Sequence, residues 1–178
     1  SRQTGARPDS GPDKSKLVIH LSWKDDRAWI YLNTTGKWLA DRGYRRIPHL
    51  APMRETLAAA VLLSTGYDGS RPLVNPMCGS GTLAIEAALI ATNRAPGLLR
   101  SNFSVLHTAL DLDDASEQAR RNAHKDTRKT DVPPIIATDH DPAAIEAAQK
   151  NAQVAGVDQL ISFQQCDFAD TPIPDTPG

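Results

Sequence analysis

With 178 residues, the chain is long enough for one domain with a substantial core, and its formal net charge of −1 excludes a general attraction to polyanions, so contacts with nucleic acid must come from local basic patches. Two cysteines, Cys78 and Cys166, exclude a disulfide framework and favour a reducing, cytoplasmic location. We expect no membrane contact, because no apolar run approaches the roughly 20 residues of a spanning helix and the first residues lack a signal-peptide core.

The first two segments predict a flexible start followed by a β-hairpin. Residues 1–16 are polar and contain Gly, Pro and Ser, so we expect a flexible tail or linker. Apolar residues then alternate with polar or smaller ones in residues 17–23 and 28–32, around a turn at 24–27. This pattern is typical of two paired strands, and we assign the hairpin a structural role.

A cluster of arginines lies in residues 33–50, which we expect to form a loop and a short helix. Arg42, Arg45 and Arg46 lie beside Tyr44 in the sequence. Such a cluster is typical of a solvent-exposed surface. The alternative is a contact between these arginines and RNA phosphates or bases, next to an aromatic ring.

Residues 51–64 (APMRETLAAAVLLS) predict a helix. Pro52 would lie near its first turn and Gly66 just past its end. Arg54 and Glu55 also belong to that first turn. We interpret both as surface charges, with a position facing a ligand as the alternative if this helix packs beside the glycine turn that follows.

Residues 72–92 (PLVNPMCGSGTLAIEAALIAT) predict a short buried strand, a tight glycine turn and a helix. Gly79 and Gly81 can take backbone angles that a Cβ would forbid. A helix that starts at such a turn presents free N–H groups and a positive dipole end, which suits an anionic or polar cofactor. The alternative is an ordinary strand-to-helix turn without a ligand.

The connection over residues 93–134 is longer than a single crossover needs and indicates an insertion. Residues 114–129 (DASEQARRNAHKDTRK) predict a polar helix inside it. The basic end of this helix is interpreted as solvated, because basic residues are favoured near a helix C-terminus, with RNA contact as the alternative. It consists of Arg120, Arg121, Lys125, Arg128 and Lys129.

The rest of the chain predicts two further strands joined by a helix. Residues 135–139 (IIATD) read as a buried strand that ends in an acid. Asp141 caps the next helix, Pro142 is its first residue and Gly156 closes it, before a third strand that starts near Leu160. The fold class is therefore α/β: part of a Rossmann-like, doubly wound parallel sheet, preceded by a β-hairpin.

Three features fall at the carboxyl ends of successive strands, where such sheets bind ligands: the turn at 75–82, Asp139 and Asp167. A carboxylate after the second strand can accept hydrogen bonds from both hydroxyls of a ribose. A carboxylate after the third strand can accept a hydrogen bond from the amino group of adenine. Residues 79–84 also fit the dinucleotide pattern, but Asp139 comes about 60 residues after Gly81, where that pattern expects an acid about 20 residues on. S-adenosylmethionine (SAM) is therefore favoured over NAD.

Residues 75–82, NPMCGSGT, resemble the D-P-M-C-G-S-G-T signature of a class I methyltransferase family, the RNA guanine-N2 methyltransferases that carry an N-terminal THUMP RNA-binding domain. The bacterial large-subunit ribosomal RNA enzyme is the type of this family. The resemblance extends over residues 30–168 and includes TG at 35–36, RGYR at 42–45, APMRETLAAA at 51–60, AIEAA at 84–88, NRAPG at 93–97, DHDP at 139–142, NA at 151–152 and AGV at 155–157.

The resemblance implies SAM as the cofactor and implies roles by position. Asp139 would hold the ribose hydroxyls, His140 would lie along the adenine, and Asp167 would accept from the adenine amino group. The backbone of Phe168 would lie beside the adenine, although Met77 and Phe168 also fit places in the core. The candidate cofactor-binding residues are Asn75, Met77, Cys78, Gly79, Gly81, Thr82, Asp139, His140, Asp167 and Phe168.

The sequence departs from this family at two points. Asn75 stands where the family has Asp, which removes the charge that would attract the ammonium of the cofactor's methionine part. The family's N/D-P-P-Y/F loop, which binds the target amino group and stacks on the flipped base, should follow a fourth strand, and the sequence ends before it. Residues 132–134 (VPP) are no substitute, because they precede the second strand.

We therefore expect a fragment without the THUMP domain and without the catalytic loop. Its parts would be a tail at 1–16, a hairpin and connecting segment at 17–50, and the cofactor-binding half of a methyltransferase domain at 51–178. No catalytic residue can be named, and we expect this chain alone to be inactive.

Three functions are compatible with the sequence. The first is methyl transfer to guanine N2 of RNA, by resemblance ribosomal RNA, through the full-length enzyme and without a metal. The second is a non-catalytic SAM- or RNA-binding fragment whose basic segments at 42–46 and 120–129 contact RNA. The third is a NAD(P)-binding oxidoreductase. A nucleophilic Cys78 or Cys166 is an alternative chemistry, but both are expected to be small buried residues.

Overall fold

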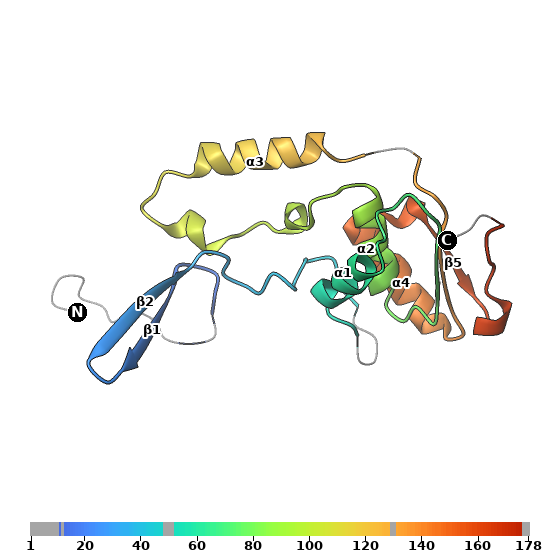
Figure 1. The fold of residues 1–178 in the computed structure, drawn as a ribbon, viewed down its shortest axis with the longest axis horizontal. Coiled ribbons are helices and arrows are strands. Elements are labelled where there is room, and N and C mark those ends of the chain that lie inside the picture. Colours follow the sequence, from blue (N-terminus) through green and yellow to red (C-terminus); the bar gives the residue numbers. More distant parts are fainter. Residues whose placement is uncertain (1–10, 12, 48–51, 129–130, 176–178) are drawn as a thin grey trace. The chain divides into compact units, whose positions relative to one another are not determined.

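The structure, a computed structural model, describes residues 11, 13–47, 52–128 and 131–175. The chain divides into two compact units (Figure 1). Unit 1 combines Ser1–Trp38 with Asn102–Asp114, and unit 2 combines Leu39–Ser101 with Ala115–Gly178. Part of the predicted insertion thus belongs with the start of the chain. The flexible tail expected at residues 1–16 lies largely outside the described residues.

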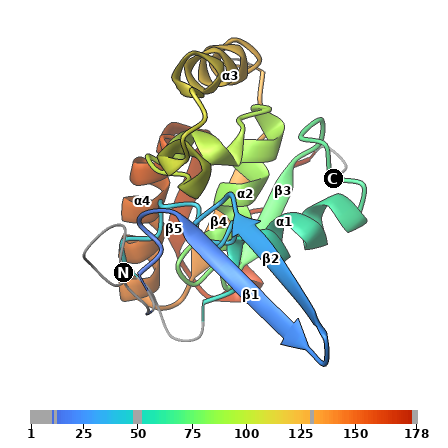
Figure 2. The ribbon, with the colours of Figure 1, turned by 90° about the vertical axis from the view of Figure 1, so that its left-hand side faces the viewer.

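Unit 1 contains the predicted hairpin, which Figure 2 shows as a two-stranded ribbon. The turn between its strands has two residues, and Asp25 takes the positive φ of 54° that such a turn requires at its first position. The turn residues and the alternation on either side of them therefore explain the hairpin. Its strands are β1 (Val18–Lys24) and β2 (Arg27–Asn33), paired antiparallel.

A residue from the insertion holds the base of this hairpin. Ser104 begins the short 3₁₀ helix η2 (Ser104–His107) and is fully buried. Its hydroxyl accepts a hydrogen bond from the Val18 N–H (3.2 Å) and donates one to the Lys16 carbonyl (2.7 Å). The insertion therefore stabilises the base of the hairpin within unit 1.

Unit 2 contains a three-stranded parallel sheet in the order β3-β4-β5 (Figure 2). Because neighbouring strands run in the same direction, their carboxyl ends meet at one edge of the sheet. This arrangement confirms the predicted α/β fold with a parallel sheet. The strands are β3 (Leu73–Pro76), β4 (Ile135–Asp139) and β5 (Ile161–Gln165).

The helix between the second and third strands of this sheet has the ends that the sequence predicts. The Asp141 carboxylate accepts from the Ala143 N–H (2.9 Å), and Gly156 closes the helix with a φ of 66°. The helices are α1 (Glu55–Ser64), α2 (Thr82–Ala91), α3 (Asp113–Lys125) and α4 (Pro142–Ala155), with further 3₁₀ turns η1 (Pro96–Leu99), η3 (Asp158–Leu160) and η4 (Phe168–Asp170).

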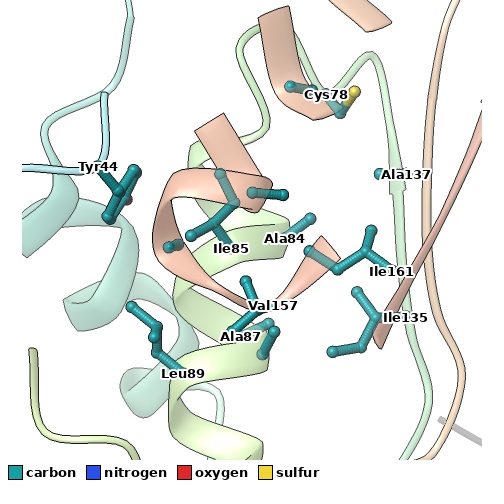
Figure 3. Close-up of a cluster of buried hydrophobic side chains, with 14 of the residues drawn as sticks. Tyr44, Cys78, Ala84, Ile85, Ala87, Leu89, Ile135, Ala137, Val157 and Ile161 are labelled. Carbon is teal, nitrogen blue, oxygen red and sulfur yellow. The ribbon is translucent and has the colours of Figure 1, made fainter. Parts of the chain in front are cut away.

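The core of unit 2 combines alanines from the helices with larger aliphatic residues from the strands (Figure 3). Helix α2 is buried along most of its length, because its small side chains allow close approach of neighbouring elements. The close-up shows Ala84, Ala87 and Ile85 of α2 near Ile135 and Ile161 of the sheet. This packing fixes the start of α2 beside the edge where the strands end.

The start of α1 differs from the prediction. The helix begins at Glu55 and not at residue 51, so Pro52 lies before it. The first helical carbonyl is that of Arg54, which accepts from the Leu57 N–H (3.0 Å). The Met53 carbonyl is outside the helix because it accepts a hydrogen bond from the Arg45 guanidinium. The residue before the N-cap of this helix is thus bonded to a side chain eight positions earlier in the chain.

Two other expectations in the connecting segments are wrong. Residues 33–47, the described part of the segment that follows the hairpin, contain no helix. Helix α3 ends at Lys125, four residues before the predicted end, and Lys129 lies outside the described residues. The Asn93 amide donates to the Asp126 carbonyl (3.1 Å), which ties the chain after α3 to the end of α2.

None of the helices within the described ranges has the length and hydrophobicity of a membrane-spanning segment.

Candidate functional site

The turn that joins β3 to α2 requires unusual backbone angles. Met77, Gly79 and Gly81 have φ values of 63°, 54° and 79°, in the left-handed region. The Cys78 N–H donates to the Thr138 carbonyl (2.8 Å), so the turn stays attached to β4 beyond the end of β3. Gly81 precedes the first residue of α2, and no side chain caps this helix. The predicted strand, glycine turn and helix are therefore all present.

The two glycines of this turn meet different surroundings. A Cβ on Gly81 would lie 2.8 Å from the Cβ of Ala148, so Gly81 allows α2 to pack against α4. A Cβ on Gly79 would meet nothing within 4 Å. Gly79 therefore borders open space on the outside of the turn, where a ligand can approach the backbone.

Asp139 lies directly against this turn. One oxygen of its carboxylate accepts from the Gly79 N–H (2.9 Å), and the other accepts from the Asp141 N–H (3.0 Å). The residue is only 8% exposed. Asp139 therefore fixes the shape of the glycine turn, a structural role that the sequence analysis did not anticipate. A carboxylate has about four acceptor positions, so two remain for a ligand.

The other predicted residues at this edge are exposed. The His140 imidazole Nδ1 is 3.4 Å from an Asp139 oxygen, and the Asp167 carboxylate caps η4 by accepting from the Ala169 N–H (3.0 Å). Phe168 is 64% exposed and Met77 is 68% exposed, so the alternative that they are core residues is wrong. Because β5 pairs with β4, Asp167 follows the strand that neighbours Asp139.

A cavity of about 260 Å³ opens beside the turn. The Oδ1 atom of Asn75, one of its lining residues, is buried and has no hydrogen-bond partner. A buried acceptor without a donor is costly, and among the described residues the Arg45 Nε and the Tyr67 hydroxyl are also buried without a partner. Of the predicted site residues, five line the cavity, and the full lining is Pro52, Met53, Asn75, Met77, Cys78, Gly79, Ser80, Thr82 and Leu83.

The two cysteines differ in exposure. Cys78 is buried, and burial, together with the nearby Asp139 carboxylate, raises the pKa of its thiol to about 12. The thiolate is the reactive form of cysteine, so Cys78 is a poor nucleophile near neutral pH. Cys166 is partly exposed, so the expectation that both cysteines are buried is wrong for Cys166.

Arg45 and Glu55 form the wall behind the cavity. The Arg45 guanidinium lies 3.5 Å from the Glu55 carboxylate and donates to the Thr82 hydroxyl (3.1 Å) and the Met53 carbonyl. Both charged side chains are more than four-fifths buried. The interpretation of Arg45 and Glu55 as surface charges is therefore wrong, whereas Arg54 is exposed. Sequence reasoning missed this pair because its members face each other only after α1 has packed.

Arg42 forms a second buried ion pair, so it does not belong to the expected surface cluster of arginines. Its guanidinium donates twice to the Glu86 carboxylate, at 3.3 Å each, and the Tyr44 hydroxyl adds a third bond (3.0 Å). Burial raises the pKa of Glu86, and burial together with the Glu86 charge raises the pKa of Tyr44. Among the three arginines, only Arg46 is exposed. Arg42 and Tyr44 therefore stabilise the fold rather than contact RNA.

Asn151 joins this segment to the glycine turn. It is fully buried on α4, and its Oδ1 accepts from the N–H groups of Arg46 (2.8 Å) and Ile47 (3.1 Å). Its amide donates to the carbonyls of Ile47 (3.0 Å) and Ser80 (3.2 Å). Every hydrogen-bonding position of this side chain is thus used, and the segment before α1 is held against the turn.

The solvated interpretation of the basic end of α3 is wrong for Arg120, whereas Arg121, Lys125 and Arg128 are exposed as expected. Arg120 is half-buried and donates to the carbonyls of Leu98 and Arg100. Arg121 is exposed and pairs with Glu117 one turn earlier (3.1 Å). Arg120 therefore holds α3 to the η1 region and is not available as an RNA contact.

A larger cavity, about 620 Å³, lies elsewhere in unit 2. Its lining comes from α1, α2, α3 and residues 93–96, and it includes Arg42 and Glu86, which are already paired with each other. None of the residues at the strand ends lines it. The cavity beside the glycine turn is therefore the better candidate for a ligand site.

Comparison with known proteins agrees with this geometry. The family described as "UPF0020: RMKL-like, methyltransferase domain" matches residues 42–176. The ribosomal RNA large subunit methyltransferase K/L of Vibrio campbellii is 41% identical over 171 residues, which are 92% of this chain and 24% of that protein. The chain thus spans about a quarter of the length of the curated relatives it matches.

Solved structures show the same fold. The crystal structure of SMU.472, described as a methyltransferase complexed with SAH, has a TM-score of 0.82 and 32% identity, and covers 91% of this chain and 42% of its own. A Listeria monocytogenes protein, described as an N6-adenine-specific DNA methylase, has a TM-score of 0.79 and 37% identity, and covers 88% of this chain and 41% of its own.

Proposed function

We propose, from the premise that this chain belongs to the UPF0020 family of RMKL-like methyltransferase domains, that it is the SAM-binding part of a methyltransferase. The observation that carries the proposal is the cavity beside the glycine turn. It is lined by Asn75, which has an unpaired buried acceptor, and by Gly79, which borders open space; Asp139 does not line the cavity but is bonded to the Gly79 N–H at the same turn. These features suit a ligand that carries both an ammonium group and ribose hydroxyls.

The residues present fit SAM or its product S-adenosylhomocysteine (SAH). The ammonium of the methionine part would donate to the unpaired oxygen of Asn75, which supplies the partner that this atom lacks. A cavity of about 260 Å³ is smaller than a typical ligand pocket, so it would take one end of the cofactor and not the whole. When bound, SAM supplies a methyl group on a positively charged sulfur. The SAH complex of the structural relative SMU.472 supports this choice.

Within this proposal the predicted residues bind and orient the cofactor. Asp139 would use its two remaining acceptor positions for the ribose hydroxyls. His140 would lie along the adenine, Asp167 would accept from the adenine amino group, and the Phe168 backbone would lie beside it. The methionine and ribose side would be formed by Asn75, Met77, Cys78, Gly79, Gly81 and Thr82.

The family assignment supports SAM over the dinucleotide alternative. Gly81, the second glycine of the dinucleotide pattern, serves helix packing against Ala148 in this chain. We therefore assign no oxidoreductase function. The alternative of a non-catalytic SAM- or RNA-binding fragment keeps the same cofactor site and differs only in the absence of methyl transfer.

For the whole protein we propose guanine N2 of ribosomal RNA as the acceptor, in the cytoplasm. The support is the likeness to the large-subunit ribosomal RNA enzyme and the motifs that resemble guanine-N2 methyltransferases. A second candidate acceptor is the amino group of adenine in DNA, because the Listeria relative is described as an N6-adenine-specific DNA methylase. Mass spectrometry of nucleosides from ribosomal RNA and DNA, in cells with and without the protein, separates the two.

Calorimetric titration of this chain tests the cofactor. We expect SAM and SAH to bind with affinities in the micromolar range, NAD to give no heat, and Asp139→Ala to weaken SAH binding. Circular dichroism reports whether each sample is folded. A folded sample that binds neither SAM nor SAH contradicts the proposal, and binding of NAD alone would restore the oxidoreductase alternative.

A further inference from the structure

The hairpin of unit 1 has two chemically different faces. Residues directly opposite each other in an antiparallel pair project to the same side of the ribbon. The register pairs Ser22 with Trp29, and the pairs two residues away on either side share that face. We call this side the aromatic face, and it consists of His20, Ser22, Lys24, Arg27, Trp29 and Tyr31.

The opposite side, which we call the apolar face, contains no charged residue. Its side chains are exposed, which is typical of a surface that another protein segment covers. Nothing on this side attracts phosphate or hydrogen-bonds to a base. It consists of Ile19, Leu21, Trp23, Ala28, Ile30 and Leu32.

Two aromatic rings of the aromatic face are available to a ligand. Trp29 is 42% exposed and Tyr31 is 55% exposed. They are two residues apart on β2, so their side chains leave the strand about 7 Å apart. This is about twice the 3.4 Å separation of stacked bases, so the rings match two bases of an extended strand. Stacking of bases on exposed aromatic residues is a common mode of RNA recognition on sheets.

The charges on this face suit a polyanion. Lys24 and Arg27 lie on it beside each other, at the end nearest the turn, and all its side chains are exposed. The acidic residues of the hairpin, Asp25 and Asp26, belong to the turn and not to the paired positions of the face. A nucleic-acid strand whose base stacks on Trp29 would therefore have its phosphates near the positive charges of Lys24 and Arg27.

We propose that the aromatic face of the hairpin is a binding surface for single-stranded RNA, with two bases stacked on Trp29 and Tyr31 and the phosphates near Lys24 and Arg27. The choice of RNA over DNA rests on the proposed function. A duplex does not fit, because its base faces are covered by neighbouring base pairs. The surface lies in unit 1 and shares no residue with the cofactor site, so it contributes contacts that the cofactor-binding part lacks.

Fluorescence anisotropy with a labelled 12-nucleotide RNA tests this surface. We expect the single strand to bind more tightly than the duplex of the same sequence, and binding to weaken as salt is raised. Trp29→Ala and Tyr31→Ala should each weaken binding about tenfold. The matched control is Trp23→Ala, which removes the same side chain from the apolar face and should leave binding unchanged.

Two further variants keep the result interpretable. Trp29→Phe retains an aromatic ring and should keep most of the affinity even if Trp29→Ala disturbs the hairpin. Replacing both Lys24 and Arg27 with Gln should reduce the salt dependence. Equal losses for Trp23→Ala and Trp29→Ala would instead indicate a protein-binding hairpin and would overturn the proposal, as would equal affinity for the single strand and the duplex or no RNA binding at all.

Calorimetry with SAH on the same samples separates this proposal from the proposed function. If the chain binds SAH but not RNA, the hairpin surface is wrong and the cofactor site stands. If it binds RNA through Trp29 but not SAH, the methyltransferase proposal fails and the hairpin surface stands. The Trp29→Ala variant should bind SAH like the unmodified chain.

Discussion

Two buried polar groups, one in α2 and one in the strand before it, differ in their hydrogen bonds. The Glu86 carboxylate, in the middle of the helix, accepts from Arg42 and Tyr44. The Oδ1 atom of Asn75, near the start of the helix, has no partner at all. A satisfied buried group stabilises the fold, whereas an unsatisfied one carries a cost that a ligand or a water molecule can relieve. Exposure and charge alone would have ranked the arginine-rich segment above Asn75 as a functional site.

The largest expected effect comes from removing a partner of the Glu86 carboxylate. Arg42→Met leaves the Glu86 carboxylate buried with one partner fewer, and should lower the free energy of unfolding by about 3–5 kcal/mol. Urea unfolding measures the change. Arg46→Met is the matched control, because the Arg46 side chain is exposed, and should change stability by less than about 0.5 kcal/mol. Similar losses for the two variants would contradict the structural role of Arg42.

Alanine substitutions at the two glycines of the turn should have different effects, one mainly on stability and the other mainly on SAH binding. Gly81→Ala forces a Cβ into contact with Ala148 at a φ of 79°, and should cost about 2–4 kcal/mol in unfolding free energy. Gly79→Ala meets no neighbouring atom and should cost only about 1 kcal/mol for its backbone angle. Its Cβ would enter the space assigned to the cofactor, so SAH affinity should fall. An unchanged SAH affinity in folded Gly79→Ala would show that the ligand does not approach the turn there.

Asp139→Asn should affect both properties, because this carboxylate has two roles. Asparagine has a single oxygen, so one of the N–H groups of Gly79 and Asp141 loses its acceptor, at a cost of about 1–2 kcal/mol in unfolding free energy. SAH affinity should fall about tenfold, since one acceptor for the ribose is lost as well. Calorimetry at a temperature where the variant is folded measures the second effect. Asp141→Asn, which keeps a good helix cap, should leave SAH affinity unchanged.

Asn75→Asp tests whether the unpaired oxygen of Asn75 binds the cofactor. A carboxylate at this buried position should bind the ammonium of SAH about fivefold more tightly than the amide does. Without ligand, the same charge is buried without a partner, so the unfolding free energy should fall. Thermal melting with and without SAH shows both effects. Weaker SAH binding in Asn75→Asp would mean that the unpaired oxygen does not face the ammonium.

The smallest effect is a dependence of stability on pH. Burial holds the pKa of Glu86 above its ordinary value of 4.5, so between that value and the raised one the folded protein binds more protons than the unfolded chain. Stability from this group therefore falls as pH rises through that interval. Glu86→Gln should remove this slope in urea unfolding measured from pH 4.5 upward. A slope that persists in the variant would come from other groups.

The chain order of the elements in unit 2 was predictable because local signals agreed. Asp141, Pro142 and Gly156 mark the ends of α4, and Gly79 and Gly81 mark the turn before α2, since caps and positive φ angles depend on neighbouring residues. The motif at 75–82 and its resemblance to known methyltransferases also came from residues that are adjacent in sequence. The hairpin was predictable for the same reason, although the sequence pattern did not reveal the different chemistry of its two faces.

What the amino-acid sequence by itself determined was therefore the α/β fold, the glycine turn and the family to which the chain belongs. Only the tertiary structure decided that Arg42 and Arg45 are buried in ion pairs, that Asp139 holds the turn, and that Asn75 retains a free acceptor. The physical reason is that a charge is satisfied or unsatisfied only by groups that approach it in space. Glu86, which pairs with Arg42, and Gly79, which donates to Asp139, each lie more than 40 residues from that partner along the chain.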